Sequence, residues 1–333
     1  MRHIRALDGV RGIAILLVLA FHTQGVGRLA EFGWSGVDLF FVLSGFLITG
    51  ILVDSANEPR RAKRFYIRRA LRILPLSYGA IIVALVASPR LAAQQGWLWT
   101  YTANIPMGLE GAQSADSIPL LSHFWSLAIE EQFYLIWPFV VWHTSRRTAI
   151  RIAWVVIVVA LACRVTLFAA GAPWATRYFL TPCRLDALAV GSLVALWPRD
   201  RVEQRMRWAG LAAGLVIAAI IVHERGFPNS PGLVDTIGYS AVAWFFGWLV
   251  TVAALQPARL LQSAPLVIAG RYSYGLYVIH PLVAAAIVAQ WPSLAGGLRC
   301  GALMWIGSWA LALVSYHGYE RWFLRLKERP WAS

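Results

Sequence analysis

The chain has 333 residues, of which 59% are hydrophobic and only 14% charged, and its mean hydropathy is +0.59. A soluble domain usually carries about 25% charged residues, and the apolar residues here form blocks of membrane-spanning length, so we expect a polytopic helical membrane protein. The net charge of +14 would indicate nucleic acid as the partner of a soluble protein. Here the basic residues cluster between apolar blocks, so topology explains the charge and no nucleic-acid partner is expected.

Ten apolar segments follow one another along the chain. They cover about 10–27, 33–53, 72–88, 123–142, 149–170, 184–198, 208–223, 237–256, 272–290 and 297–318. The sixth is short, and the third and seventh only just reach the roughly 17 residues that a membrane helix needs. We therefore expect an all-α protein of about ten transmembrane helices, forming a single domain over 1–333 with no appended soluble domain.

The first segment follows MRHIR and therefore imitates a signal peptide. Asp8 and Arg11 interrupt its apolar run and no clean small-x-small site follows, so we expect no cleavage. Arg11 and His22 are eleven residues apart, which places them on one helical face and about 16 Å apart along the axis. This stripe indicates a channel for a long ligand. The alternative is an anchoring arginine and an incidental histidine.

Basic residues are concentrated in the loops after the second, fourth and sixth segments and in the C-terminal tail. The opposite loops offer only Arg28, Arg90, Arg177 and Arg225. The positive-inside rule therefore predicts that both termini are cytoplasmic and that the protein lies in the cytoplasmic membrane. The longest external loop, 89–122, is either a lid, an acceptor-recognition loop or a connector.

Ionisable residues inside the apolar segments are costly and usually functional. Those expected in the outer half are His22, Asp38, Glu130, Glu131, Arg164, Arg184 and Asp186, while His280 is near the middle of its segment. They indicate one polar cavity that opens outward. The alternative is a set of structural ion pairs, in which Arg164, Arg184 and Asp186 serve only to neutralise the carboxylates.

On the cytoplasmic side, the sequence FYIRRALRILP places Arg68, Arg69 and Arg72 at the mouth of the third segment. Residues three or four apart share a helix face, and arginine forks suit phosphate oxygens. Positive-inside anchoring is the alternative explanation. A donor with an anionic head and a reactive tip would fit between Arg11 and His22, and acyl-coenzyme A has that shape.

Six motifs resemble those of the acyltransferase family 3 membrane proteins, which O-acylate sugars of lipopolysaccharide, peptidoglycan, Nod factors and antibiotics. They occur in order over about residues 5–320. The motifs are LDGVRGIAILLVLAFH (Leu7–His22), GVDLFFVLSGFLIT (Gly36–Thr49), RRALRILP (Arg68–Pro75), HFWSLAIEEQFYLIWP (His123–Pro138), RLDALAVGSLVA (Arg184–Ala195) and SYGLYVIHP (Ser273–Pro281).

The resemblance implies transfer of an acyl group, with acetyl expected, from cytoplasmic acyl-CoA to a hydroxyl of a cell-envelope glycan or secondary metabolite. It implies that Arg11 and His22 are the essential pair and that Arg69 and Arg72 serve the donor. Acyl-CoA would be a co-substrate, and we expect no permanently bound cofactor and no metal. The partners are then the donor, the hydroxyl-bearing acceptor and the lipid bilayer. The acceptor and the oligomeric state stay open.

Acyl transfer from a thioester needs a base for the acceptor hydroxyl, and His22 is our candidate because imidazole titrates near neutral pH. Glu130 or Glu131, and after them Asp38, would orient it as in a catalytic triad. A covalent acyl-His22 intermediate is the alternative. Further pocket or acceptor candidates are Trp125, Ser126, Arg184, Asp186 and His280, each of which has packing or structure as its alternative role.

A transporter or flippase of a free or lipid-linked glycan is the competing class of function. Its intramembrane charges would carry protons or bind a sugar. Such proteins commonly contain internal repeats, and the sequence shows no convincing internal symmetry.

Overall fold

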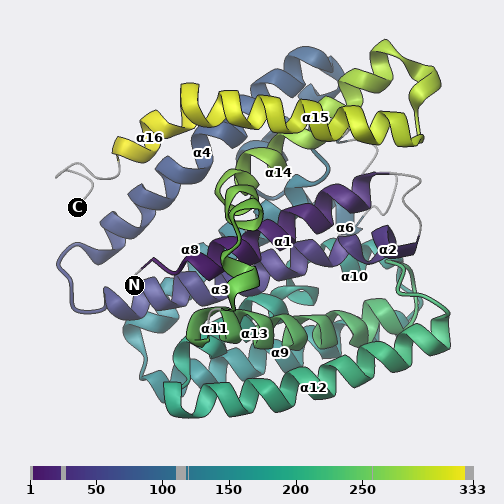
Figure 1. Ribbon diagram of the computed structural model, residues 1–333. Coiled ribbons are helices and arrows are strands. Elements are labelled where there is room, and N and C mark those ends of the chain that lie inside the picture. The colour runs from purple at the N-terminus through teal and green to yellow at the C-terminus, as the bar shows by residue number, and fades with distance from the viewer. Residues whose placement is uncertain (1–2, 24–27, 110–117, 119, 257, 327–333) are drawn as a thin grey trace.

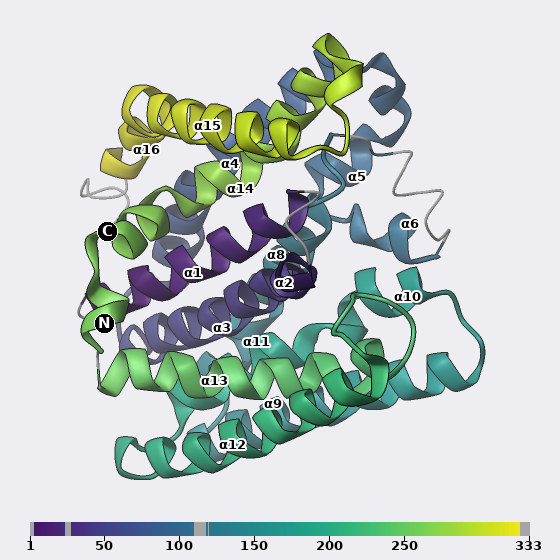
Figure 2. The ribbon, with the colours of Figure 1, turned by 45° about the vertical axis from the view of Figure 1, so that its right-hand side comes forward.

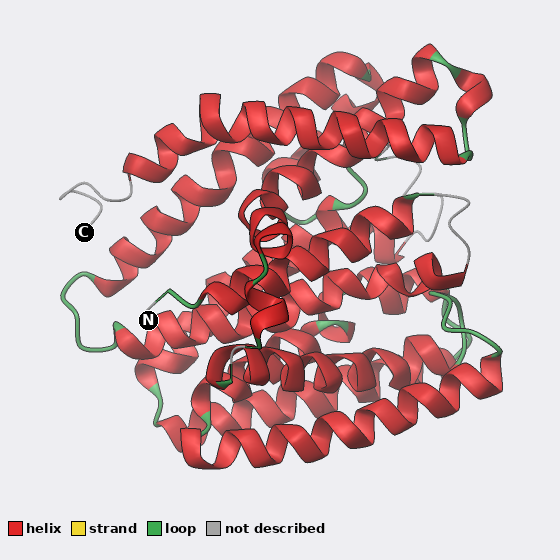
Figure 3. Ribbon diagram, in the orientation of Figure 1, coloured by secondary structure: helices red, strands yellow, loops and turns green. Residues whose placement is uncertain are grey.

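The computed structural model describes residues 3–23, 28–109, 118, 120–256 and 258–326, and their regular structure is helical, with no strand (Figures 1 and 3). The all-α prediction is confirmed. Seven helical spans in these residues are long and apolar enough to cross a membrane. They are Phe32–Asp54, Arg61–Ala87, Arg146–Ala169, Arg199–Glu224, Val234–Leu255, Ala264–Gln290 and Leu298–Leu326. The other three expected segments coincide with shorter or more polar helices, so the number ten stays a prediction.

The long helices are α1 (Arg5–His22), α3 (Gly36–Asp54), α4 (Arg61–Ala87), α8 (Phe124–His143), α9 (Arg146–Ala169), α11 (Leu185–Leu196), α12 (Arg199–Glu224), α13 (Tyr239–Leu255), α14 (Ala264–Gln290) and α15 (Leu298–Ser315). Short elements connect them: α2 (Arg28–Glu31), η1 (Phe32–Ser35), η2 (Pro89–Gln94), α5 (Gln95–Trp99), α6 (Asn104–Leu109), α10 (Trp174–Phe179), η3 (Thr181–Cys183), η4 (Val234–Gly238), η5 (Arg259–Gln262), η6 (Pro292–Leu294), η7 (Tyr316–Glu320) and α16 (Arg321–Leu326).

Helices α1 and α3 run through the middle of the molecule. Figures 1 and 2 show α4, α15 and α16 on one side of this pair and α9, α12 and α13 on the other. Helix α1 packs on α14 and α3 packs on α11. Glycines on both helices allow the first contact: a Cβ on Gly12 of α1 would lie 2.1 Å from the Leu266 carbonyl oxygen, and one on Gly270 of α14 would lie 1.8 Å from that of Asp8. Small residues let membrane helices approach closely, so they fix α1 against α14.

Several helices begin earlier than the apolar pattern predicts. Helix α4 starts at Arg61 rather than near residue 72, and α12 starts at Arg199 rather than near residue 208. Arginine and lysine are good helix formers, so the helix continues beyond the apolar stretch. Much of the expected basic loop 54–71 is therefore the first part of α4.

The basic residues gather at one end of the bundle. One cleft is lined by Ile4, Asp54, Arg146, Arg199 and Leu255, which brings together the starts of α1, α9 and α12 and the ends of α3 and α13. We call this the basic end. Its cytoplasmic location stays a prediction.

The long loop 89–122 contains η2, α5 and α6. Residues 110–117 and 119 of this loop, and residues 24–27 of the first expected segment, lie outside the described residues. The expectation of a lid or an acceptor-recognition loop therefore stays a prediction.

Candidate active site

A cavity of about 650 Å³ opens at the basic end between α1, α3 and α4, and we call it the basic vestibule. Its lining includes six arginines and three carboxylates. These are Arg11, Arg61, Arg64, Arg68, Arg69, Arg72, Asp8, Asp54 and Glu58. Arg68 and Arg72 form no ion pair with any described residue. These two side chains are therefore free to bind an anion that enters the vestibule.

A second cavity, the inner channel, has a volume of about 170 Å³, and apolar residues of α3 line one side of it. Arg11, Arg69, Arg72, Leu47, Ile48 and Ile51 line both cavities, so the two are contiguous. The other end of the inner channel is lined by Ser126 and Tyr277. The path thus begins among arginines and narrows between apolar side chains toward α8 and α14.

Arg11 lies where the vestibule meets the channel. Its Nη1 donates to Oδ1 of Asp8 at 3.0 Å, and His3 Nε2 lies 2.6 Å from Oδ2 of the same carboxylate. The Arg11 side chain keeps 21% of its surface exposed. Asp8 therefore holds the guanidinium in place while leaving part of it open to the cavities.

Arg69 is enclosed by residues of α8. Its Nη2 lies 3.7 Å from Oε2 of Glu130 and its Nε 3.5 Å from Oε1 of Glu131. The guanidinium carbon lies 3.6 Å from the centre of the Tyr134 ring, which is a cation–π contact. Ser44 of α3 donates to Oε1 of Glu130 at 2.8 Å. Arg69 therefore ties α4 to α8 and is less available to a ligand than Arg68 or Arg72.

The carboxylates that were expected to orient His22 have other partners in the structure. Among the described contacts, Glu130 and Glu131 pair with Arg69, and Asp38 pairs with Arg184 instead of His22. The position of each residue along its apolar segment predicts that Glu130 and Glu131 lie in the outer half of the membrane and that Arg69 lies at the opposite, cytoplasmic end. Depth along the backbone does not account for the length of the arginine side chain, whose methylene stem lets the guanidinium extend away from its own backbone position.

His22 is oriented by its own helix. Its Nδ1 lies 2.8 Å from the Val18 carbonyl oxygen, and because a carbonyl only accepts, Nδ1 carries the proton and Nε2 is left as the acceptor. The side chain is exposed. A backbone carbonyl thus takes the place of the expected carboxylate, and the ring presents a basic nitrogen at the end of α1.

Two other histidines complete what we call the histidine cluster: His22, His123 and His280. The His22 and His280 ring centroids are 4.8 Å apart, and those of His123 and His280 are 5.5 Å apart. His280 is fully buried, and its Nδ1 donates to the Leu276 carbonyl oxygen at 3.0 Å. Within the described residues, no group of three or more His, Cys, Asp or Glu side chains is arranged to hold a metal ion.

One residue that lines the inner channel contacts this cluster. Tyr277, which lines the channel, lies 5.3 Å from the His123 ring between centroids. Its hydroxyl donates to the His123 carbonyl oxygen at 2.9 Å and lies 2.5 Å from the Ser126 hydroxyl. Ser126 is thus a channel-lining residue, and a ligand that fills the channel would bring its tip close to the histidines.

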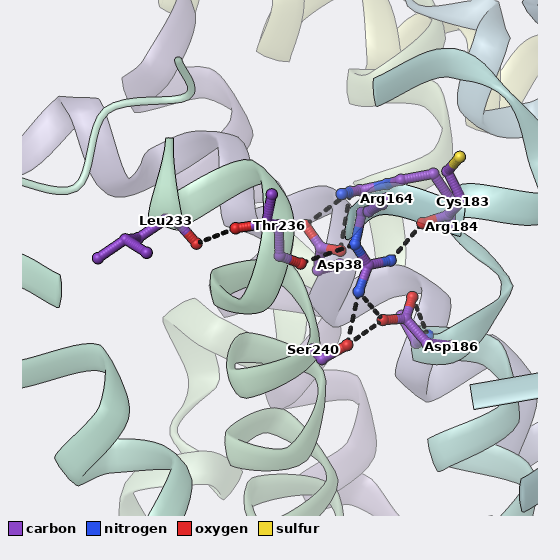
Figure 4. Close-up of polar contacts among 9 residues, drawn as sticks. Asp38, Arg164, Cys183, Arg184, Asp186, Leu233, Thr236 and Ser240 are labelled. Atoms are coloured by element: carbon purple, nitrogen blue, oxygen red, sulfur yellow. Dashed lines mark hydrogen bonds and ion pairs between the residues drawn. The ribbon is translucent and has the colours of Figure 1, made fainter. Parts of the chain in front are cut away.

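The remaining candidates form buried ion pairs away from the channel (Figure 4). Arg184 Nη2 donates to both Asp38 oxygens at 2.8 and 3.0 Å, and Arg164 Nη2 donates to Asp186 at 2.7 Å. Their side chains are at most 3% exposed. These pairs join α3, α9 and α11. They agree with the alternative interpretation, in which the charged residues form structural ion pairs. The pairing of Arg164 and Arg184 with Glu130 or Glu131, also considered, does not occur.

Trp125 belongs to the same buried region. Its ring meets Phe41 edge to face at 6.0 Å and lies 5.8 Å from the Arg184 guanidinium. Trp125, Arg184 and Asp186 do not line the vestibule or the channel. Their packing roles are therefore visible in the structure, and a role in binding the acceptor stays a prediction.

The sequence of the chain matches the family described as an acyltransferase domain over residues 4–316. The chain belongs to this family. It is 29% identical to the peptidoglycan O-acetyltransferase OatA of Listeria monocytogenes, with 84% of this chain and 49% of that protein covered. It is 33% identical to the putative peptidoglycan O-acetyltransferase YrhL of Bacillus subtilis, with 87% and 50% covered.

The O-acetyltransferase OatA of Staphylococcus aureus is 27% identical, with 84% of this chain and 50% of that protein covered. The chain thus spans about half the length of these curated relatives. No solved structure matches it.

Sequence reasoning missed four residues of the site: Ser44, His123, Tyr134 and Tyr277. Each is a polar or aromatic member of a motif already quoted. Two of them carry a signal in the sequence, because their hydroxyls lie at helical spacing from a candidate residue. Tyr134 is four residues after Glu130, and Tyr277 is three residues before His280. Ser44 and His123 required the tertiary structure.

Proposed function

We propose that this chain is an integral-membrane O-acyltransferase that moves an acetyl group from cytoplasmic acetyl-CoA to a hydroxyl of a cell-envelope glycan. The observation that carries the proposal is that the basic vestibule is contiguous with the inner channel, and that Tyr277, which lines this channel, contacts His123 of the histidine cluster. Arg11 lies where the two cavities meet, and His22 of the cluster lies on the same helix, about 16 Å away by the rise of an α-helix.

The donor would lie along this path with its nucleotide in the vestibule. Arg68 and Arg72, which have no ion-pair partner in the described part of the chain, would bind the phosphates, since guanidinium groups match phosphate oxygens. Arg11 would bind where the path narrows. The pantetheine arm would extend between the apolar side chains of α3, and the thioester would reach Ser126 and Tyr277.

His22 would then act as the general base. Its Nε2 accepts the proton of the acceptor hydroxyl, the oxygen attacks the thioester carbonyl, and the C–S bond breaks as the ester forms. The coenzyme A thiolate takes up the proton and leaves as the thiol. In the alternative with a covalent intermediate, Nε2 itself attacks the carbonyl, and the C–S bond breaks as coenzyme A leaves as the thiolate. The acceptor hydroxyl then attacks acyl-His22, which frees Nε2 as the ester forms, and the proton of the hydroxyl passes to the thiolate.

The names of the relatives support the choice of acyl group and acceptor. They are described as O-acetyltransferases, two of them of peptidoglycan. Acetyl is therefore the acyl group and a peptidoglycan fragment the acceptor to test first.

The test uses the full chain in liposomes, with radiolabelled acetyl-CoA supplied at the basic end and a muramyl glycan fragment at the other. We expect labelled ester on the glycan, and a loss of about 10²- to 10⁴-fold in His22→Ala, the range typical of general-base removal. His143→Ala, at an exposed position of α8 outside the histidine cluster, is the control. Glycan movement without acetylation would instead identify a transporter.

A further inference from the structure

A wide groove lies on the outside of the bundle between α9, α12 and α13, far from the vestibule and the channel. Its volume is about 980 Å³. Four tryptophans line it, and we call it the tryptophan groove: Trp154, Trp197, Trp208 and Trp244. Figures 1 and 2 show these three helices together on the side of the molecule away from α4 and α15.

Apart from Arg205, the side chains that line the groove are apolar or aromatic. On α12, Trp208, Ala209, Ala212 and Val216 line it, and residues three or four apart share one face of a helix. The alanines form a shallow floor, and the rings of Trp154 and Trp244 lie 5.2 Å apart between centroids. Trp154 and Trp208 are 41% and 60% exposed. The groove is thus shaped for an extended hydrocarbon chain.

Its mouth at the basic end is cationic. The guanidinium of Arg205 lies 5.1 Å from the Trp197 ring centre and forms no ion pair with a described carboxylate. Arg201 lies one turn earlier on the same face of α12, and its Nε is 3.6 Å from the exposed Asp200. On α9, Arg147 and Arg151 lie one turn before the groove residues Ile150 and Trp154.

We propose that the tryptophan groove binds one anionic phospholipid, with its phosphate at Arg205 and one acyl chain along the tryptophans. The groove is lined by two candidate membrane spans, Arg146–Ala169 and Arg199–Glu224, whose apolar windows are only 22% buried, so we expect lipid around it. Charge complementarity selects the occupant, because basic residues near a membrane surface attract anionic headgroups. The ammonium of a zwitterionic lipid would be repelled by the same arginines.

The test is tryptophan quenching of the full chain in phosphatidylcholine vesicles that contain a small fraction of a lipid brominated on its chains. We expect brominated phosphatidylglycerol to quench at a several-fold lower mole fraction than brominated phosphatidylcholine. Trp208→Phe should remove part of the fluorescence that brominated phosphatidylglycerol quenches at low mole fraction. That loss would assign the quenched fluorescence to the groove. Equal quenching by the two lipids in the wild type would overturn the proposal.

Arg205→Gln should reduce the preference for phosphatidylglycerol about fivefold, since one basic residue contributes about 1 kcal/mol near the surface. The matched control is Arg325→Gln, which removes the same charge from α16 on the other side of the molecule. An equal loss in this control would show a diffuse charge effect and refute the site.

A second variant tests the acyl-chain part without altering charge. Ala212 is exposed on the groove floor, so Ala212→Phe fills the groove while the arginines stay. We expect loss of the selective quenching with unchanged thermal unfolding. Retained quenching would show that no lipid chain lies there. Glycerol phosphate in solution should not compete, because the apolar chain supplies much of the binding.

Discussion

The imidazole rings of His22 and His280 meet edge to face, with their centroids 4.8 Å apart. Each ring is held through Nδ1 by a carbonyl oxygen of its own helix, that of Val18 for His22 and that of Leu276 for His280. Two helices, α1 and α14, thus bring together two rings whose orientation depends on backbone and not on a carboxylate. If His22 is the base, His280 helps to fix where its ring can lie, together with Phe21, whose ring centroid is 5.3 Å away.

The first prediction concerns His280. Replacing it with Ala leaves a void beside His22 and lets that ring move, and small misplacements of a catalytic group cost up to about 10²-fold in rate. We expect His280→Ala to lower kcat for acetyl transfer by roughly 10- to 100-fold with little change in the KM for acetyl-CoA. The steady-state kinetics of purified variants would measure this.

His143 offers a matched control for that experiment. It lies on α8 with the same Nδ1 bond to a backbone carbonyl, that of Phe139 at 3.0 Å, but it is exposed and outside the histidine cluster. His143→Ala should keep full activity. A His280→Ala enzyme as active as His143→Ala would show that His280 does not support catalysis.

The second prediction separates Arg69 from Arg68. Removing Arg69 leaves Glu130 and Glu131 without their counter-charge, and breaking a buried pair costs about 3–5 kcal/mol; the partial exposure of these groups places the expected loss at the low end. Arg68→Ala breaks no ion pair, so it should keep the unfolding temperature and raise the KM for acetyl-CoA. Thermal unfolding in detergent together with donor kinetics would check both.

Equal destabilisation by Arg69→Ala and Arg68→Ala would contradict this distinction. Arg69→Lys is the informative intermediate. It keeps the charge but loses the planar fork that reaches two carboxylates and stacks on Tyr134, so we expect partial recovery of stability.

The third prediction concerns the buried pair of Asp38 and Arg184, whose side chains are 2% and 1% exposed. Asp38→Asn leaves a buried guanidinium without its counter-charge and should destabilise the protein by about 3–5 kcal/mol. The double variant Asp38→Asn, Arg184→Met should be less destabilised than the sum of the two single variants. Additive effects in a double-mutant cycle of unfolding would mean that the pair is not coupled.

The sequence predicted the helical class and several of the residues that line the vestibule and the channel. Hydrophobic blocks follow from the need to satisfy every backbone group in lipid, and the Arg11–His22 stripe follows from helix geometry alone. Both depend on one helix at a time. Three arginines that line the vestibule, Arg68, Arg69 and Arg72, likewise follow from their spacing within α4.

The ion-pair and hydrogen-bond partners of these residues could not be predicted from one helix at a time. Pairing Glu130 with Arg69, or Asp38 with Arg184, depends on how deep one helix lies against another and on how far an arginine side chain reaches. Many pairings of the same charges satisfy the composition of the segments. The backbone carbonyl that orients His22 has no side-chain signal at all, so a carboxylate was the natural but incorrect expectation.

The last prediction tests how α1 is positioned. A side chain at Gly12 would place its Cβ 2.1 Å from the Leu266 carbonyl oxygen, so Gly12→Val must push α1 away from α14. Overpacking of this kind costs about 1–3 kcal/mol, and the shift would also separate His22 from His280. We expect a lower unfolding temperature and a loss of acetyl transfer larger than the loss of folded protein. Gly79→Val on α4, where no atom lies within 4 Å, is the control and should retain both. A Gly12→Val enzyme with normal stability and activity would show that the close packing of α1 on α14 does not set the geometry of the site.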